Sequence, residues 1–262
     1  MKKNYVILFF LSALIAGCNN PPENYKKGIE KQTAKEYETA IEFLKLVGNE
    51  DKEWKDSANV RIDELVKSIF STNDLNRIVK FSRKSFEDSL LTKKIITTAL
   101  NQWDEKLTKN KALEAFDFFD SLRFMYKGVP GIDVKIRNTE DAFFKGVWKC
   151  HKGTLKGNEI YFDRDEDNNL VQGKSNKNTN GWNLGKVIYK DIFYIGNHAL
   201  DHRVRVYNTD YWGDQIEYFT KTKGSMTILS ADSILVNYEG SVGSGNKVCF
   251  VKKEAENKKL NP

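Results

Sequence analysis

Gly128-Val129-Pro130-Gly131 divides this chain of 262 residues into two parts whose hydrophobic periodicities differ. Before it, apolar residues recur every three or four positions, which is the spacing of one face of an α-helix. After it, apolar and polar residues alternate between glycine turns, which is the pattern of half-buried strands. We therefore predict a multi-domain α+β protein, with a helical domain over residues 33–128 and an antiparallel β domain over residues 140–253.

Five apolar stripes occupy the helical part. Thr33-Ala34-Lys35-Glu36 has the spacing of a capping box and predicts the start of the first helix. The stripes are Tyr37, Ala40, Ile41, Leu44 and Val47; Trp54, Ala58, Ile62, Leu65, Val66 and Ile69; Leu75, Ile78 and Val79; Phe86, Leu90, Ile95, Ala99, Leu100, Trp103 and Leu107; and Ala112, Leu113, Phe116, Phe119 and Leu122. Since a neighbour must cover each stripe, we expect a helical bundle or a stack of helical hairpins.

Nine short runs in the second part are predicted to be strands. In Arg203-Val204-Arg205-Val206-Tyr207 the two valines share one face and the arginines share the other. The runs cover residues 143–151, 159–162, 170–174, 186–195, 203–207, 215–220, 225–229, 234–238 and 247–251. Eight or nine strands at near-regular spacing indicate a meander that is closed as a barrel or folded as a sandwich.

The first predicted strand contains Gly146-Val147-Trp148, which resembles the Gly-x-Trp signature of lipocalins and related calycin barrels. Residues 228–236 are similar to the paired late strands of small bacterial lipocalin-like domains. Thr209-Asp210-Tyr211 matches the lipocalin Thr-Asp-Tyr triplet, but it lies nearer to Gly146 than in that family. No arginine follows Tyr211, so the family's late arginine that packs on the tryptophan is missing. The resemblance implies a lipocalin-like barrel of about eight strands.

The amino terminus has the features of an export signal. Met1-Lys2-Lys3 is basic, and residues 5–16 form an apolar run too short to span a bilayer. Leu14-Ile15-Ala16-Gly17-Cys18 resembles the lipobox of bacterial lipoproteins. That resemblance implies a signal peptide over residues 1–17, cleavage after Gly17, and diacylglyceryl and palmitate-type acyl groups on Cys18. Residues 18–32 would then be the lipidated cysteine and a polar spacer.

These features predict an extracytoplasmic location at the cell envelope. Lipid on Cys18 would anchor the chain to a membrane surface. Because Asn19 follows instead of aspartate, the outer membrane is favoured where two membranes exist, facing the periplasm or the surface. The formal charge of +6 includes Lys2 and Lys3, and basic residues alternate with acidic ones along the chain. This pattern excludes nucleic acid as an expected partner.

Two further cysteines, Cys150 and Cys249, fall in the first and last predicted strands. Those strands would be neighbours in a closed barrel, and an exported protein can form disulfides. A bond between the two cysteines would constrain a loop of about a hundred residues and stabilise the fold by about 3–5 kcal/mol. The alternative is a pair of reduced thiols.

Acidic and histidine clusters are weak metal candidates. Asp163, Asp165 and Asp167 have the alternation with which a calcium loop begins. The run then departs from an EF-hand, with Asn168 for glycine at the sixth position and Lys174 for glutamate at the twelfth. A polar hairpin tip explains it equally well, and we assign no metal.

The spacing of His198 and His202 is that of a zinc helix, but the glutamate of the motif is missing and the residues fall among strands. We predict a solvated loop there. No phosphate-binding loop or Gly-x-Ser-x-Gly elbow is present, so no catalytic residue and no cofactor is assigned.

Aromatic and arginine residues gather in the middle of the β domain. The candidates for lining a ligand pocket are Trp182, Tyr189, Tyr194, Arg203, Arg205, Tyr207 and Trp212. Aromatic side chains with a few polar groups line ligand sites, but they also fill the interior of any small barrel.

The sequence therefore favours a non-enzymatic envelope lipoprotein that binds a hydrophobic small molecule or an envelope protein. The first alternative is an interaction scaffold that uses the helical domain, with a purely structural barrel. The second is a metal-assisted hydrolase.

Overall fold

The structure is a computed structural model that describes residues 21–153, 156–168, 170–178, 183–209, 215–220, 225–237 and 247–253. For residues 205–209 and 215–220 it describes the backbone alone. Cys18 and the rest of the predicted export signal lie outside the described residues. The described helices include none that is long and apolar enough to cross a membrane.

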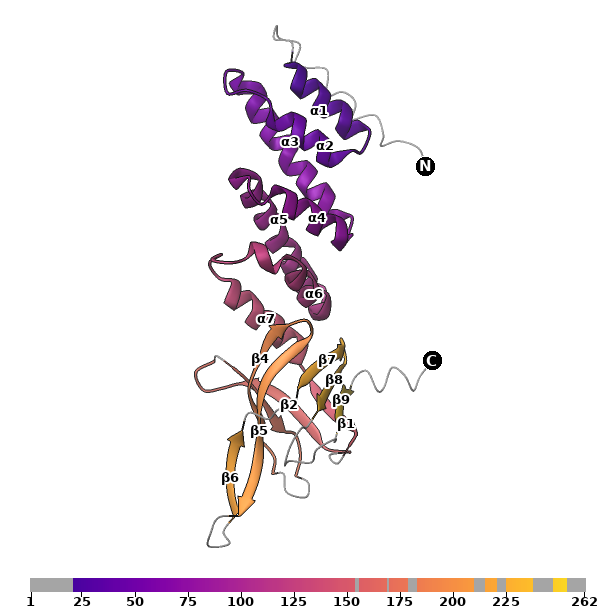
Figure 1. Cartoon of the computed structure of the whole chain (residues 1–262). Helices are drawn as coiled ribbons and strands as arrows, with labels where there is room; N and C mark the ends of the chain where they lie inside the picture. Colours follow the sequence, from indigo (N-terminus) through magenta and orange to yellow (C-terminus); the bar gives the residue numbers. More distant parts are fainter. Residues whose placement is uncertain are drawn as a thin grey trace, which may run out of the picture. The chain divides into compact units, whose positions relative to one another are not determined.

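The chain forms two compact units, residues 1–84 and residues 85–262. The first unit is helical, and its amphipathic stripes face one another as predicted, with Ile41, Ile62 and Leu65 among the fully covered residues. Its helices are α1 (Glu23–Thr33), α2 (Tyr37–Lys45), α3 (Lys52–Ser71) and α4 (Leu75–Ser85), the last of which ends at the unit boundary (Figure 1).

Helix α1 corrects the prediction of a polar spacer and of a capping box at Thr33. Gly28 packs so closely on α2 that a Cβ there would lie 2.7 Å from Leu44 Cγ, and the Tyr25 ring lies 5.0 Å from that of Trp54. Thr33 ends α1, where its hydroxyl donates to the Ile29 carbonyl. Contact with α2 and α3 holds this polar segment as a helix, which its sequence pattern does not show.

The second unit begins with helices α5 (Ser89–Thr108), α6 (Ala112–Leu122), the short 3₁₀ helix η1 (Arg123–Met125) and α7 (Ile132–Phe144). Helix α7 was not predicted, and residues 143 and 144 belong to it and not to the first strand. Trp103 on α5 is fully buried and its indole N–H donates to Thr139 Oγ1 on α7 at 2.9 Å. This bond satisfies the polar atom of the largest core side chain of the helices.

Nine strands follow, close to the nine predicted runs. They are β1 (Val147–Lys152), β2 (Glu159–Arg164), β3 (Val171–Ser175), β4 (Val187–Gly196), β5 (Ala199–Thr209), β6 (Gln215–Thr220), β7 (Met226–Ser230), β8 (Ser233–Asn237) and β9 (Lys247–Lys252).

The sheet is closed into an antiparallel barrel. Its order is β4-β3-β2-β1-β9-β8-β7-β5-β6, and an additional pairing of β4 with β5 joins the two ends of an eight-stranded ring. Strand β6 is outside that ring, because it pairs with the later residues 204–209 of β5, whereas β7 pairs with Ala199 and Leu200. The barrel predicted for this domain is therefore confirmed over the sandwich, and closure leaves no free sheet edge in the ring.

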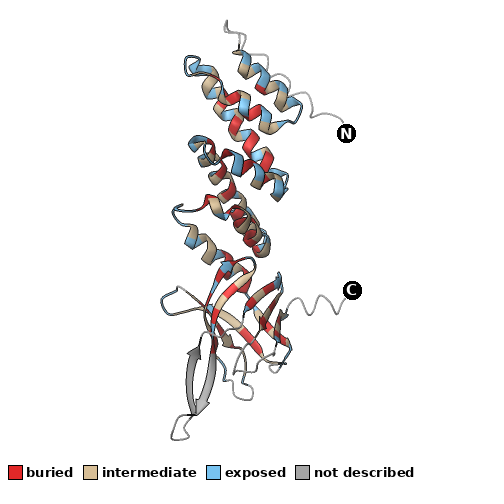
Figure 2. Ribbon diagram, in the orientation of Figure 1, coloured by how far each residue is buried: buried red, intermediate tan, exposed pale blue. Residues whose placement is uncertain are grey.

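Buried and more exposed residues alternate along the strands of the barrel (Figure 2). The buried apolar side chains of the strands include Trp148, Cys150, Ile160, Val171, Tyr189, Ile192, Leu200, Val204, Met226, Ile228, Ile234, Val236, Val248 and Phe250. This period of two is the one the sequence pattern predicts.

Candidate functional site: the barrel interior and its closed end

His202 lies on the inner face of β5, between the buried side chains of Leu200 and Val204. It is 3% exposed. Strand β5 begins at Ala199, four residues before the predicted strand, so the prediction of a solvated loop at His202 was wrong. Pairing with β4 decides this position, because β4 and β5 form a hairpin whose turn is Asn197 and His198.

The His202 imidazole has one nitrogen that is buried without a partner. Nε2 forms no hydrogen bond within the described part of the chain. Burial lowers the pKa of His202, while the Asp201 charge and a hydrogen bond with the Leu200 backbone act in the opposite direction. The imidazole is therefore neutral at pH 7.

Tyr189 on β4 lies beside His202, with their ring centroids 6.0 Å apart. It is fully buried, and it meets Phe250 of β9 edge to face, at 6.0 Å between centroids. Gly173 of β3 faces this ring, and a Cβ added there would lie 3.2 Å from Tyr189 Cδ2. The absence of a side chain at Gly173 thus gives Tyr189 its place in the interior.

Helix α7 supplies a buried carboxylate at one end of the barrel. Glu140 Oε1 accepts from the Tyr194 backbone N–H at 2.7 Å, and Glu140 Oε2 accepts from Arg164 Nη2 at 3.1 Å. Arg164 Nε also donates to Asp141 at 2.7 Å. Burial raises the pKa of Glu140, and the bonds from Tyr194 and Arg164 oppose that rise. The Glu140–Arg164 pair joins α7 to β2, and the Tyr194 bond joins α7 to β4.

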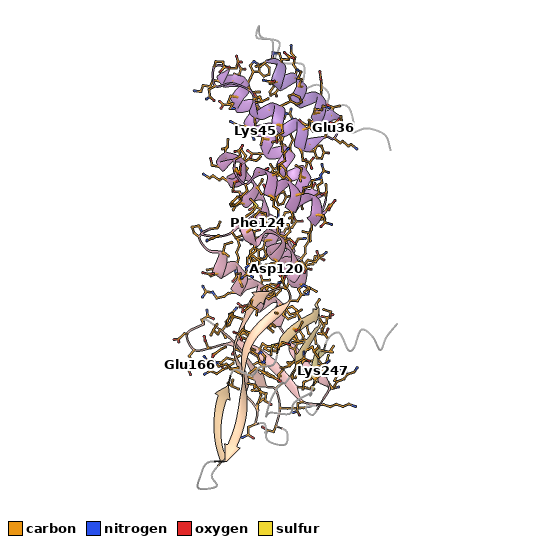
Figure 3. All side chains as sticks on the ribbon, in the orientation of Figure 1. Glu36, Lys45, Asp120, Phe124, Glu166 and Lys247 are labelled. Carbon is orange, nitrogen blue, oxygen red and sulfur yellow. The ribbon has the colours of Figure 1, made fainter. Side chains whose placement is uncertain are left out.

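Helix α6 holds the hairpin between β4 and β5 at the same end. Asp120 Oδ2 accepts from Tyr194 Oη at 2.5 Å and from Asn197 N at 2.7 Å, and Figure 3 labels Asp120 on its helix. The Tyr194 ring stacks on Phe116 of α6 with centroids 4.0 Å apart. Arg123 Nη1 donates to the Ile195 carbonyl at 2.9 Å. These contacts close this end of the barrel with side chains of the helices.

The hairpin turn held by α6 is strained. Gly196, Asn197 and His198 all have positive φ, at 107°, 51° and 60°. His198 Nε2 lies 2.5 Å from Asp117 Oδ1. Two consecutive left-handed residues that are not glycine persist only where neighbouring contacts determine them, and α6 supplies those contacts.

The Gly-x-Trp residues lie at the same end. Trp148 is fully buried, and its indole N–H donates to the Phe144 carbonyl at 3.0 Å. Lys252, directly opposite in β9, places its ammonium 5.0 Å from the centroid of the Trp148 ring. Lys252 thus supplies a cation on the tryptophan where the sequence lacks the expected arginine, and only the register of β1 and β9 reveals it.

The predicted pocket residues separate into three groups. Tyr189 lies in the interior, and Tyr194 lies at the closed end. Arg203 is on the outer face, with its side chain 52% exposed and 2.9 Å from Asp191 Oδ2. Trp182 and Trp212 lie outside the described residues, as do the side chains of Arg205 and Tyr207. His202, Glu140, Asp120 and Lys252 were missed; the alternation of Leu200, His202 and Val204 is the signal that could have found His202.

The two cysteines are on neighbouring strands, as predicted, but they are free thiols. Cys150 is directly opposite Phe250, and it is buried in the interior. Cys249, one residue earlier than Phe250, is half-buried on the other face of β9. Because side chains of adjacent residues point to opposite faces of a strand, Cys150 and Cys249 start from different faces of the sheet, beside a bulge between Cys150 and Lys152. The disulfide prediction is corrected for that reason.

The acidic run after β2 forms the turn to β3. Asp163 Oδ2 lies 3.0 Å from Lys174 Nζ, and that hydrogen bond lowers the pKa of Asp163. Asp165 N donates to the Leu170 carbonyl across the turn, and Asn168 has φ 57°. Within the described ranges no three His, Cys, Asp or Glu side chains gather as metal ligands would. The run thus follows β2 into a hairpin with β3, as the hairpin-tip interpretation predicted.

No protein-family model, curated protein or solved structure matches this chain. Function is therefore inferred from the residues themselves. The described interior combines apolar walls, aromatic rings and the imidazole of His202, whose Nε2 has no hydrogen-bond partner among the described residues.

Proposed function

We propose that the protein is a lipid-anchored envelope lipoprotein whose lipocalin-like barrel binds a small hydrophobic molecule without chemically changing it. The observation that carries this proposal is His202 Nε2, an unpaired polar atom on the inner wall of a closed and largely apolar barrel. A buried polar group without a partner costs free energy, and such a cost persists where function uses the group.

The closed end supports the same proposal. Asp120, Glu140 and Arg164 tie α6 and α7 to the barrel through bonds to β2 and β4. A site fixed by such contacts keeps its shape without a ligand, which lowers the entropy lost on binding. The Gly-x-Trp resemblance supports a lipocalin-like barrel, with Lys252 on the Trp148 ring in place of arginine.

Native mass spectrometry of the purified chain tests the binding function. We expect a retained molecule, or uptake of the apolar fluorescent probe 1-aminoanthracene, with one molecule per chain. Gly173→Leu is the blocking variant, because a Cβ at Gly173 would already lie 3.2 Å from Tyr189 Cδ2, so a larger side chain must displace the Tyr189 ring. Equal uptake by the blocked variant would place the probe outside the barrel and contradict the proposal.

The lipid anchor is tested separately. In cells fed a radiolabelled fatty acid, the wild-type chain should be labelled and should sediment with membranes, and Cys18→Ala should do neither. Cys249→Ala is the matched control, since it removes a thiol far along the chain and should leave labelling intact. A labelled Cys18→Ala chain would overturn the anchor.

One observation favours the scaffold function as a second candidate. Phe86, just before α5, and Leu90, in the first turn of α5, are 51% and 54% exposed. A hollow of about 450 Å³ lies beside them, lined by Phe86, Glu87, Ser89, Thr92, Lys93, Ile96 and Thr97. Exposed apolar side chains around a hollow mark protein-binding surfaces. An envelope partner bound here would be released by Phe86→Asp, whereas ligand uptake by the barrel would be unchanged.

A further inference from the structure

A cleft of about 360 Å³ lies where the last turn of helix α7 meets the end of β2 and the start of β3. A Cβ built at Gly146, which borders the cleft, would meet no atom within 4 Å, so the main chain there faces open space. The volume falls within the range of about 300–1,000 Å³ that small-molecule sites occupy. Neither His202 nor Tyr189 lines the cleft, so it is a site apart from the barrel interior.

Two aromatic rings and one aliphatic side chain form the apolar part of the cleft. The Phe144 ring of α7 and the Phe162 ring of β2 lie 4.4 Å apart between centroids, and Val171 of β3 is the third apolar residue of the lining. Trp148 packs on both rings, with centroids 6.5 Å from Phe144 and 5.8 Å from Phe162. Rings fixed in this way favour a flat apolar ligand, because aromatic pairs attract beyond the area that they bury.

Three of the four charged side chains that line the cleft are already paired. Arg164 Nε donates to Asp141 Oδ1 at 2.7 Å, and Arg164 Nη2 donates to Glu140 Oε2 at 3.1 Å. Asp163 Oδ2 accepts from Lys174 Nζ at 3.0 Å. The protein itself thus supplies partners for Arg164, Asp141 and Asp163.

Lys145, the fourth charged residue of the lining, directly follows α7. It is exposed, and its ammonium pairs with no carboxylate in the part of the chain that the structure describes. Asp141 lies one helical turn earlier, but Arg164 holds that carboxylate. A cation in the cleft would have to compete with Arg164 and Lys174, whereas an anion meets the ammonium of Lys145 without a competitor.

We infer that this cleft binds a flat apolar molecule that carries one anionic group, a carboxylate or a sulfonate. The rings of Phe144 and Phe162 contact the apolar body, and the Lys145 ammonium pairs with the anion. The inference goes beyond the function proposed above, because it assigns a second site, outside the barrel interior, that selects its ligand by charge.

Two fluorescent probes that share an anilinonaphthalene body test the inference on the purified chain. 8-Anilino-1-naphthalenesulfonate carries the anion, and N-phenyl-1-naphthylamine is its neutral counterpart. The measured quantity is the ratio of the two affinities, because the contribution of the shared body cancels in it. Lys145→Gln should reduce the preference for the sulfonate by about two- to fivefold, the size expected of an exposed ion pair, and Lys145→Glu should reduce it further.

Lys127→Gln is the matched control, since Lys127 is an exposed lysine that does not line the cleft. It should leave the ratio of affinities unchanged. Because Lys145 is exposed as well, its replacement should leave the core intact. The inference is overturned by an unchanged ratio in Lys145→Gln, by an equal fall in both variants, or by a wild-type chain that does not bind the sulfonate.

The position of the bound probe can be read from ¹H–¹⁵N spectra of the wild-type chain. The amide resonance of Gly146 should shift with the sulfonate probe, because Gly146 borders the cleft. The amide resonance of Val248, which is buried in the barrel, should not shift. A shift at Val248 without one at Gly146 would place the probe in the barrel interior, which refutes the cleft site and supports the binding function proposed above.

Discussion

The hydroxyl of Tyr194 in β4 donates to Asp120 Oδ2 in α6 at 2.5 Å, and the same carboxylate oxygen accepts from Asn197 N at 2.7 Å. One side chain thus binds both a strand end and the strained turn that follows it. Helices α6 and α7 are joined to the barrel by specific polar contacts as well as by apolar packing, and substitutions at these contacts test their contribution to stability.

Asp120→Ala should lower the free energy of unfolding by about 1–3 kcal/mol, because it leaves Tyr194 Oη and Asn197 N without their acceptor. Urea unfolding followed by circular dichroism measures the change. Glu105→Ala is the control: Glu105 pairs with Lys109 on the exposed face of α5, and its loss should leave the urea midpoint in place. An Asp120→Ala midpoint equal to that of the control would show that the contact contributes nothing.

Arg164→Leu should lower the free energy of unfolding by about 3–5 kcal/mol, because it leaves the Glu140 carboxylate buried without its cation. Adding Glu140→Gln should recover much of this loss, since glutamine still accepts from Tyr194 N and bears no charge. Burial raises the pKa of Glu140, so the folded state takes up a proton at a higher pH than the unfolded state. The difference in free energy of unfolding between the wild-type chain and Arg164→Leu should therefore shrink as the pH is lowered from 7 toward 5. A deficit that grows on acidification would contradict this account.

His202→Leu should increase the free energy of unfolding of the ligand-free chain by about 1 kcal/mol at pH 8, because it removes a buried polar atom that has no partner. Such a gain in stability on removing a polar side chain is typical of a residue kept for function. Thermal unfolding of both chains measures it. A variant less stable than the wild type would indicate that His202 is a packing residue.

The same pair of chains should respond differently to pH. The pKa of His202 is lowered in the folded state, so below its ordinary value of 6.5 the unfolded state binds the proton more readily. The wild-type chain should lose stability relative to His202→Leu as the pH falls through that value. Above about pH 7.5 the difference between their free energies of unfolding should stay constant. Unfolding measured at several pH values tests both the sign and the window.

The thiols should react one after the other. Cys249 is half-buried, whereas Cys150 is buried, and burial raises the pKa of Cys150 to about 11. A thiol reagent at pH 8 should modify Cys249 in the folded chain and Cys150 only after unfolding, because the thiolate is the reactive form. Peptide mapping identifies the modified residue. Recovery of a Cys150–Cys249 disulfide under non-reducing conditions would contradict the register of β1 and β9.

Much of the fold is predictable because strands and helices leave different periods in the sequence. The runs at 159–162, 215–220 and 247–251 are strands within a few residues of the predicted bounds, and the stripe of α3 is buried as expected. Glycine and polar turns between alternating runs signal a meander, and the first and last strands of a closed meander must pair. These are local patterns, so the sequence alone determined them.

The tertiary structure decided which face and which register each residue takes. Helix α1 forms because Gly28 packs on Leu44 of α2, a contact that its own polar sequence does not indicate. His202 is inside the barrel because the β4–β5 hairpin turns at Asn197 and His198, and helix α6 holds that turn through Asp120. A shift of one residue in strand pairing moves every side chain to the opposite face. The alternation of Leu200, His202 and Val204 is compatible with an inward position for His202, but only the pairing of β4 with β5 shows that the strand extends back to Ala199 and makes that position real.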